Sequence, residues 1–165
     1  MPESIEKLAE KLRQEGEKTI EFFLALPPVA WNITMYTDGA DWTIEDILVH
    51  FVITEKGISQ IVGDILGGGA GSPPDLVLDE FNRKTVARRK DRVIADLCTE
   101  FGELRGATVR LVLGMNDEDL LKQGRHPFLG IASLEDILKL MYRHNQIHQR
   151  DIRRGLAAFE SSSSL

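Results

Sequence analysis

The chain of 165 residues has one cysteine, Cys98, and so cannot form an internal disulfide bond. It has no apolar run that approaches the roughly 20 residues needed to cross a membrane. Its first ten residues, MPESIEKLAE, are acidic and polar where a secretory signal would be basic and then apolar. These absences predict a cytoplasmic protein with no membrane association.

The chain also lacks an excess of positive charge. It has 20 Lys and Arg against 26 Asp and Glu, a net charge of -6, and its basic residues are dispersed except in the segment 83–92. Phosphate backbones are bound by clustered Lys and Arg in a positive field, so we expect no nucleic acid partner. The length suits one domain with a single hydrophobic core.

Apolar residues recur at helical spacing through most of the chain, between recognisable start and stop signals. Ser4 precedes the first such pattern and Pro27-Pro28 ends it, because proline lacks a backbone donor. Thr43 with Asp46 forms a capping-box-like start for the second. Asp91 is expected to begin the fourth helix, and Ser133 with Asp136 the fifth. The predicted helices are 5–26, 43–66, about 76–89, 91–114 and 133 to about 159.

Segments 67–75 and 124–130 have loop composition, and no alternating stretch bounded by hairpin signals is found. Long amphipathic helices must bury their apolar stripes against one another. We therefore predict an all-α four-helix bundle with an extra short helix before the third long one. It forms a single domain over residues 1–160, and a Ser-rich tail at 161–165 is expected to be frayed.

The most informative segment is LMYRHNQIHQRDIRRG, residues 140–155, where His144, His148 and Asp151 follow one another at i, i+4 and i+7. Projected at about 100° per residue, the core stripe of this helix contains Asn145 and His148. His144 and Asp151 lie on one flank, about 80° and 100° from the centre of the stripe. The stripe also holds Leu134, Ile137, Leu138, Met141, Ile152, Leu156 and Phe159.

A single inward histidine is usually a core residue whose ring nitrogens find hydrogen bonds. Two histidines one turn apart present two nitrogens that one divalent ion can bridge. A metal site then needs a third ligand from elsewhere, and the helix 43–66 offers His50 on the flank of its own stripe. Glu55 projects near the middle of that stripe, so it needs a cation, a donor or a proton. The structural alternative for Glu55 is an ion pair with an arginine of a neighbouring helix.

Several motifs in this order resemble the DinB-like superfamily. They are WTIEDILVH at 42–50, DEFN at 79–82, NDEDL at 116–120 and YRHNQIHQRDI at 142–152. The resemblance covers about residues 5–158.

It implies a four-helix bundle in which His50, His144 and His148 hold a divalent metal at one end of a central pocket. Members of this superfamily include transferases and isomerases that use a low-molecular-weight thiol, and small-molecule hydrolases. Many members have no known activity. A Gly-Gln often follows the second histidine of the pair in this superfamily, whereas Arg150-Asp151 stands here.

Three neutral imidazoles leave coordination positions open on zinc, nickel or iron(II), and such an ion lowers the pKa of bound water or thiol. Glu55 and Asp151 are the candidate catalytic acids or bases. Asp151 could instead accept an imidazole N–H or bond an arginine on the rim. Asn82 and Trp42 are the candidate substrate-binding residues. Their alternatives are an exposed polar residue of a helix for Asn82 and a core residue for Trp42.

Two other residues are expected to lie apart from the chemistry. His126, in the loop 124–130, is expected at the surface, although a loop at the mouth of the bundle could contact substrate. Cys98 has no base beside it and is expected to be a packing residue.

Two functions follow from these residues. The first is a metal-dependent enzyme, a hydrolase or a transferase of a low-molecular-weight thiol, acting on a small electrophilic substrate. The second is a non-enzymatic bundle that binds a metal or a ligand. We also expect a homodimer that pairs through exposed helix faces.

Overall fold

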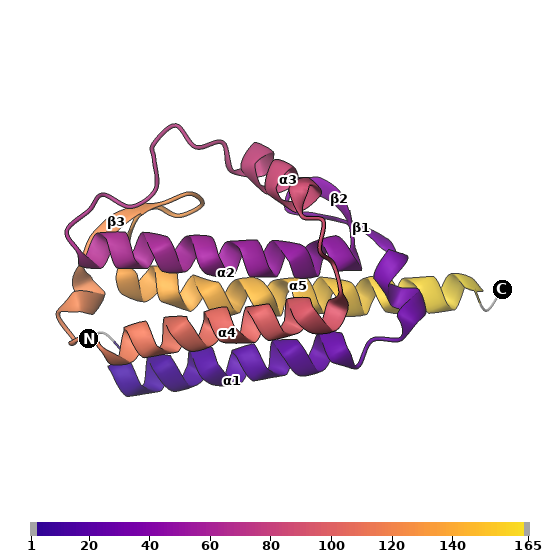
Figure 1. Cartoon of the computed structure of the whole chain (residues 1–165), viewed down its shortest axis with the longest axis horizontal. Coiled ribbons are helices and arrows are strands. Elements are labelled where there is room, and N and C mark those ends of the chain that lie inside the picture. Colours follow the sequence, from indigo (N-terminus) through magenta and orange to yellow (C-terminus); the bar gives the residue numbers. More distant parts are fainter. Residues whose placement is uncertain (1–2, 164–165) are drawn as a thin grey trace.

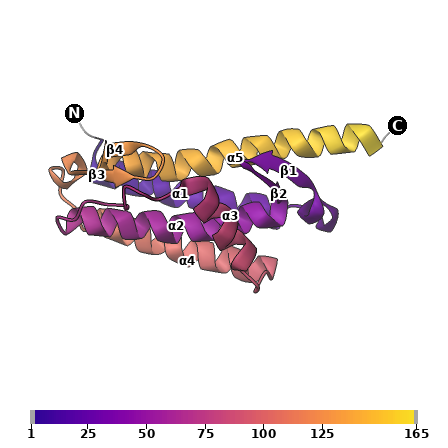
Figure 2. The ribbon, with the colours of Figure 1, turned by 90° about the horizontal axis from the view of Figure 1, so that it is seen from above.

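The computed structural model describes residues 3–163 and shows a bundle of four long helices (Figure 1). Helix α1 packs against α4 and α5, and α2 packs against the same two helices. A shorter helix, α3, lies outside the bundle and contacts α2 (Figure 2). The helices are α1 (Ile5–Leu24), α2 (Ile44–Leu66), α3 (Leu78–Arg88), α4 (Ile94–Leu113) and α5 (Leu134–Ser163). The predicted four-helix bundle with an extra short helix is confirmed.

The helix boundaries follow the predicted capping residues in three of four cases. The Ser4 hydroxyl accepts from the Lys7 backbone N–H at the start of α1. Thr43 and Asp46 form a full capping box at the start of α2. The Asp136 backbone N–H donates to the Ser133 hydroxyl at the start of α5. The expectation for Asp91 was wrong, because α4 begins three residues later and has no side-chain cap.

Two β-hairpins were not predicted, and each leads directly into a long helix. Strands β1 (Thr34–Thr37) and β2 (Ala40–Thr43) precede α2, while β3 (Gln123–His126) and β4 (Gly130–Ser133) precede α5. The first hairpin turns at Asp38-Gly39, where both residues have positive φ, 49° and 76°. An Asp-Gly pair is favoured in such two-residue turns. The expectations of no hairpin and of a plain loop at 124–130 were therefore wrong.

The C-terminal end of α5 extends past the other helices (Figure 1), so its last turns have little to pack against. Phe159 is accordingly 40% exposed, although the projection placed it in the core stripe. The helix continues to Ser163, four residues beyond its expected end, and includes the first part of the predicted frayed tail. The remainder of that tail, 164–165, lies outside the described residues. No helix within 3–163 is both long and apolar enough to span a membrane.

Candidate metal centre

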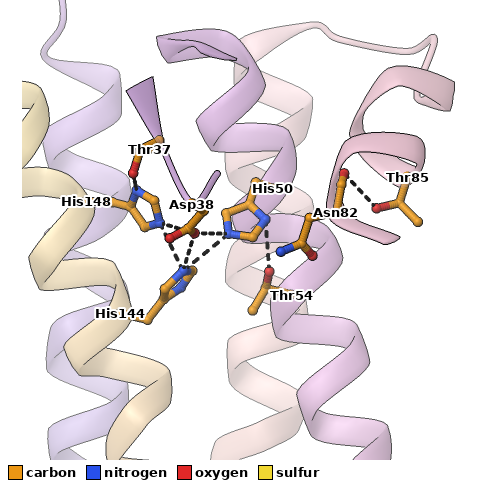
Figure 3. A network of polar contacts seen from close by, with 8 residues as sticks. All are labelled: Thr37, Asp38, His50, Thr54, Asn82, Thr85, His144 and His148. Atoms are coloured by element: carbon orange, nitrogen blue, oxygen red, sulfur yellow. Dashed lines mark hydrogen bonds and ion pairs between the residues drawn. The ribbon is translucent and has the colours of Figure 1, made fainter. Parts of the chain in front are cut away.

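Four side chains from a hairpin turn and two helices converge at one point inside the bundle (Figure 3). His50 comes from α2, His144 and His148 come from α5, and Asp38 comes from the β1–β2 turn. One ligand atom of each lies within 4.8 Å of the others. The structure thus brings together the three histidines selected from the sequence and adds a carboxylate that the sequence analysis missed.

We call this group the metal centre because it is a candidate metal-binding site. The polar contacts within it are all made by the Nε2 atoms of the histidines and Oδ2 of Asp38. The carboxylate oxygen lies 2.9 Å from His50, 3.1 Å from His144 and 2.7 Å from His148. The His144 Nε2 lies 3.2 Å from that of His50 and 2.9 Å from that of His148. His50 and His148 are buried, whereas the His144 and Asp38 side chains are 21% and 35% exposed.

Two threonine hydroxyls contact the Nδ1 atoms of two of the imidazole rings, the ring nitrogens that face away from the metal centre. Thr37 Oγ1 lies 3.2 Å from His148 Nδ1, and Thr54 Oγ1 lies 3.3 Å from His50 Nδ1 (Figure 3). When the hydroxyl oxygen accepts the Nδ1–H, the unprotonated Nε2 is the atom that faces the centre. In that tautomer both rings have the orientation in which metal-ligating histidines are commonly held.

The donor set of the metal centre fits a divalent cation. Three imidazole nitrogens with free lone pairs and one carboxylate oxygen can share one space only if a cation or added protons lie among them. Adjacent nitrogens at about 2.1 Å from one ion are separated by about 3.0–3.4 Å, depending on its geometry. The nitrogen separations of 2.9 and 3.2 Å are close to that range.

The protonation equilibria favour the metal-binding forms of these groups. Burial lowers the pKa of His50 to about 4, although hydrogen bonding to Asp38 partly opposes this effect. Burial also lowers the pKa of His144. Burial alone would raise the pKa of Asp38, but the close contacts of its carboxylate with the three imidazole Nε2 atoms hold that pKa well below its usual range. Near neutral pH the centre therefore presents neutral rings at His50 and His144 and an anionic carboxylate.

A pocket of about 440 Å³ opens beside the metal centre. Asp38, His50 and His144 form one side of it. Asn82 of α3, which is buried, and His126 of β3 add further polar groups to its lining. Trp42 does not line this pocket but is 5% exposed and packs on His50, with ring centroids 4.7 Å apart. The remaining wall is largely apolar.

Glu55 is buried but is engaged away from the metal centre. Its carboxylate accepts from the Arg105 guanidinium of α4, at 2.7 Å from Nε and 3.0 Å from Nη2. Thr108 Oγ1 donates to it at 3.1 Å. The structural alternative for this residue, an ion pair with an arginine of a neighbouring helix, is confirmed. Its predicted catalytic role stays a prediction.

The other candidate residues lie in three different settings. Asp151 is part-exposed, and its carboxylate lies 3.6 Å from Arg150 Nε. His126 is 5% exposed, so the expectation of a surface position was wrong. Cys98 is buried in the core, as expected, and burial raises the pKa of its thiol. Asp38 could have been found from its Asp-Gly turn signal, had that signal been interpreted as a hairpin.

Comparisons with known proteins give a fold rather than a named family. No family model matches the chain, and no curated protein matches it. Among solved structures, YfiT of Bacillus subtilis is similar to this chain, with a TM-score of 0.74 and 20% identity. The alignment covers 94% of this chain and 87% of YfiT. YfiT is described as a probable metal-dependent hydrolase with an unusual four-helix bundle topology. An uncharacterised protein of Escherichia coli UTI89 has a TM-score of 0.74 and 12% identity, covering 97% and 96%.

A mutant of the mycothiol-dependent maleylpyruvate isomerase is also similar, with a TM-score of 0.69 and 12% identity. The alignment covers 91% of this chain but only 61% of the isomerase. The fold expected from the DinB-like resemblance is confirmed by these neighbours. At identities of 12–20% these neighbours support the fold alone, so the chemistry of this protein has to be inferred from its own residues.

Proposed function

We propose that this protein is a metal-dependent enzyme that acts on a small electrophilic molecule, by hydrolysis or by transfer of a low-molecular-weight thiol. One observation carries the proposal: three histidine nitrogens and a carboxylate oxygen converge at the side of a pocket large enough for a small substrate. The similarity to a probable metal-dependent hydrolase and to a thiol-dependent isomerase supports it.

In this proposal the Nε2 atoms of His50, His144 and His148 would hold a zinc, nickel or iron(II) ion. The bound ion would act as a Lewis acid and make hydroxide or thiolate available near neutral pH. Thr37 and Thr54 keep the rings of His148 and His50 oriented through Nδ1.

We propose Asp38 as the group that completes the centre, either as a fourth ligand or as the acceptor of the proton released by water or thiol. It contacts all three histidines and is anionic near neutral pH. Neither of the two acids chosen from the sequence contacts the three histidines in this way: Glu55 is bound by Arg105, and the Asp151 carboxylate lies 3.6 Å from Arg150 Nε. Asn82, on the pocket wall, is proposed to orient substrate.

If the reaction is thiol transfer, the thiol has to come from solution. The one cysteine of the chain, Cys98, lies in the hydrophobic core, and its raised pKa keeps it as a thiol. The pocket beside the metal centre is where a small thiol and an electrophile could meet.

The test is turnover of a panel of small electrophiles, including esters, amides and epoxides, with zinc, nickel or iron(II) and with or without added thiols. We expect activity that needs the metal and is lost in His50→Ala and His148→Ala. Thiol dependence would decide between transfer and hydrolysis. Activity equal to the wild type in both histidine variants would contradict the proposal.

The second candidate function is non-enzymatic binding of a metal or ligand, and the same experiment addresses it. Stoichiometric metal with no turnover across the panel would favour it. The predicted homodimer and cytoplasmic location stay predictions. Light scattering tests the first, and a monomeric mass would remove it.

A further inference from the structure

His126 stands at the end of β3, where the second hairpin turns back over the bundle, and its ring is held in one orientation by the turn. Its Nδ1 accepts from the backbone N–H of Phe128 at 3.0 Å and from that of Leu129 at 3.1 Å. Two backbone N–H groups therefore donate to the same ring nitrogen.

These contacts determine where the ring carries its proton. A nitrogen that accepts two N–H groups is unprotonated, so a neutral His126 carries its hydrogen on Nε2. Burial lowers the pKa of His126 to about 4, and the positive charge that His144 could carry acts in the same direction. At neutral pH the ring is thus a neutral donor with a fixed tautomer.

The Nε2–H of His126 has no hydrogen-bond partner among residues 3–163, yet the residue lines the pocket. Ser72 Oγ is the one buried side-chain nitrogen or oxygen within the described residues that lacks a partner. The Nε2 atom of His126 is therefore not fully buried, and the pocket is the space into which it can donate. A free donor beside an apolar cavity is suited to a ligand acceptor.

The rest of the pocket restricts what that ligand can be. Its apolar wall is formed by Ile58, Leu78, Phe128, Leu140, Met141 and Ile147. None of its described lining residues is Lys or Arg, and Asp38 and Asp79 add carboxylates. Apart from a bound metal ion, an anionic ligand would find no positive charge in this lining and would meet two carboxylates, whereas a neutral, mostly apolar molecule would bury its surface.

We propose that His126 is a substrate-binding residue, whose Nε2–H donates a hydrogen bond to a carbonyl-type oxygen of a neutral, mostly apolar substrate. This inference rests on the proposed function for its choice of site. It adds the substrate class, and it assigns to His126 a role distinct from that of the three metal-centre histidines.

The tautomer can be tested without substrate. In ¹⁵N NMR spectra of the labelled protein at pH 7, we expect His126 to show an unprotonated Nδ1 and a protonated Nε2. A ring protonated on Nδ1, or on both nitrogens at this pH, would overturn the proposal.

Donation into the pocket can be tested with two probes of nearly the same shape, acetophenone and α-methylstyrene, of which only the first has a carbonyl oxygen. Both are titrated into metal-free protein in the presence of a chelator, so that no ion contributes. One hydrogen bond is expected to change the ratio of the two dissociation constants about three- to tenfold between wild type and a variant without the donor.

Two variants remove the Nε2–H of His126 differently. In His126→Asn the shorter side chain can still accept from the turn through its amide oxygen, as Asn does in tight turns, and the donor that remains, the amide N–H, has a shorter reach than Nε2–H. In His126→Phe the ring volume is kept. We expect both variants to lose the preference for acetophenone. A preference retained in both, or lost only in Asn82→Leu, would overturn the assignment.

The binding test is independent of catalysis. Loss of metal binding or of turnover would not change the probe ratio in metal-free protein. Conversely, an unchanged ratio would leave the metal-dependent reaction standing and remove only the role of His126.

Discussion

Two buried polar clusters lie within the bundle and share helices α2 and α5, and they differ in how donors and acceptors are matched. The first is the metal centre. The second, which we call the closed cluster, is made of Glu55 of α2, Arg105 and Thr108 of α4, and Asn145 of α5. His50 and Glu55 are five residues apart on α2, and His144 and Asn145 are adjacent on α5.

In the closed cluster every contact joins a donor to an acceptor. The guanidinium of Arg105 donates to both oxygens of Glu55, to Asn145 Oδ1 at 2.7 Å and to the Leu12 backbone oxygen at 2.9 Å. In the metal centre, by contrast, ring nitrogens and a carboxylate oxygen face one another, and no Lys or Arg of the described residues bonds to them. A buried cluster that is balanced stabilises the fold, whereas one with surplus acceptors is suited to binding a cation.

The largest expected effect comes from unbalancing the closed cluster. Arg105→Met leaves the Glu55 carboxylate buried without a cation, and we expect a loss of about 3–5 kcal/mol in the free energy of unfolding. Denaturant titration measures this loss. Replacing both residues, in Arg105→Met with Glu55→Met, should recover much of it, because no charge is then left unpaired. A double variant less stable than the single one would contradict the ion-pair account.

Lowering the pH is expected to reduce the stability of the metal-free protein through His50 of the metal centre. The pKa of His50 is lowered to about 4 in the folded state, so between about 6.5 and 4 the unfolded chain binds more protons. The free energy of unfolding should therefore fall as the pH is lowered through this window, by on the order of 3 kcal/mol from this residue. Denaturant titrations at several pH values measure it. His50→Asn should reduce the pH dependence in this window, and an unchanged dependence would refute the assignment to His50.

The smallest expected effect comes from removing one hydroxyl group, and it is tested by comparing Thr54 with Thr108. Thr54→Val removes the hydroxyl at His50 Nδ1 and should weaken metal binding about 10- to 100-fold, as is typical when an outer partner of a ligand is lost. Thr108→Val removes a donor to Glu55 instead and should cost about 1–2 kcal/mol of stability with no change in metal affinity. Calorimetric titration with zinc separates the two. Equal metal affinities in both variants would argue against the role of Thr54.

The helices and the three histidines could be predicted because helical periodicity and the His144–His148 spacing are local properties of the sequence. The hairpins were missed because strands of four residues are too short for alternation to stand out. Asp38 was missed with them, since its position depends on a turn. Helix projection found Glu55 buried, but its partner Arg105 lies 50 residues away, and only tertiary packing decides that pairing.

The central claim is that the metal centre binds one divalent ion through its three histidines. Its most direct test is metal content after purification without chelator and reconstitution with zinc or nickel, in wild type, His148→Ala and His126→Asn. We predict one ion per chain in the wild type, the same content in His126→Asn, and its loss in His148→Ala. A wild type without stoichiometric metal, or a His148→Ala variant that retains it, would contradict the account.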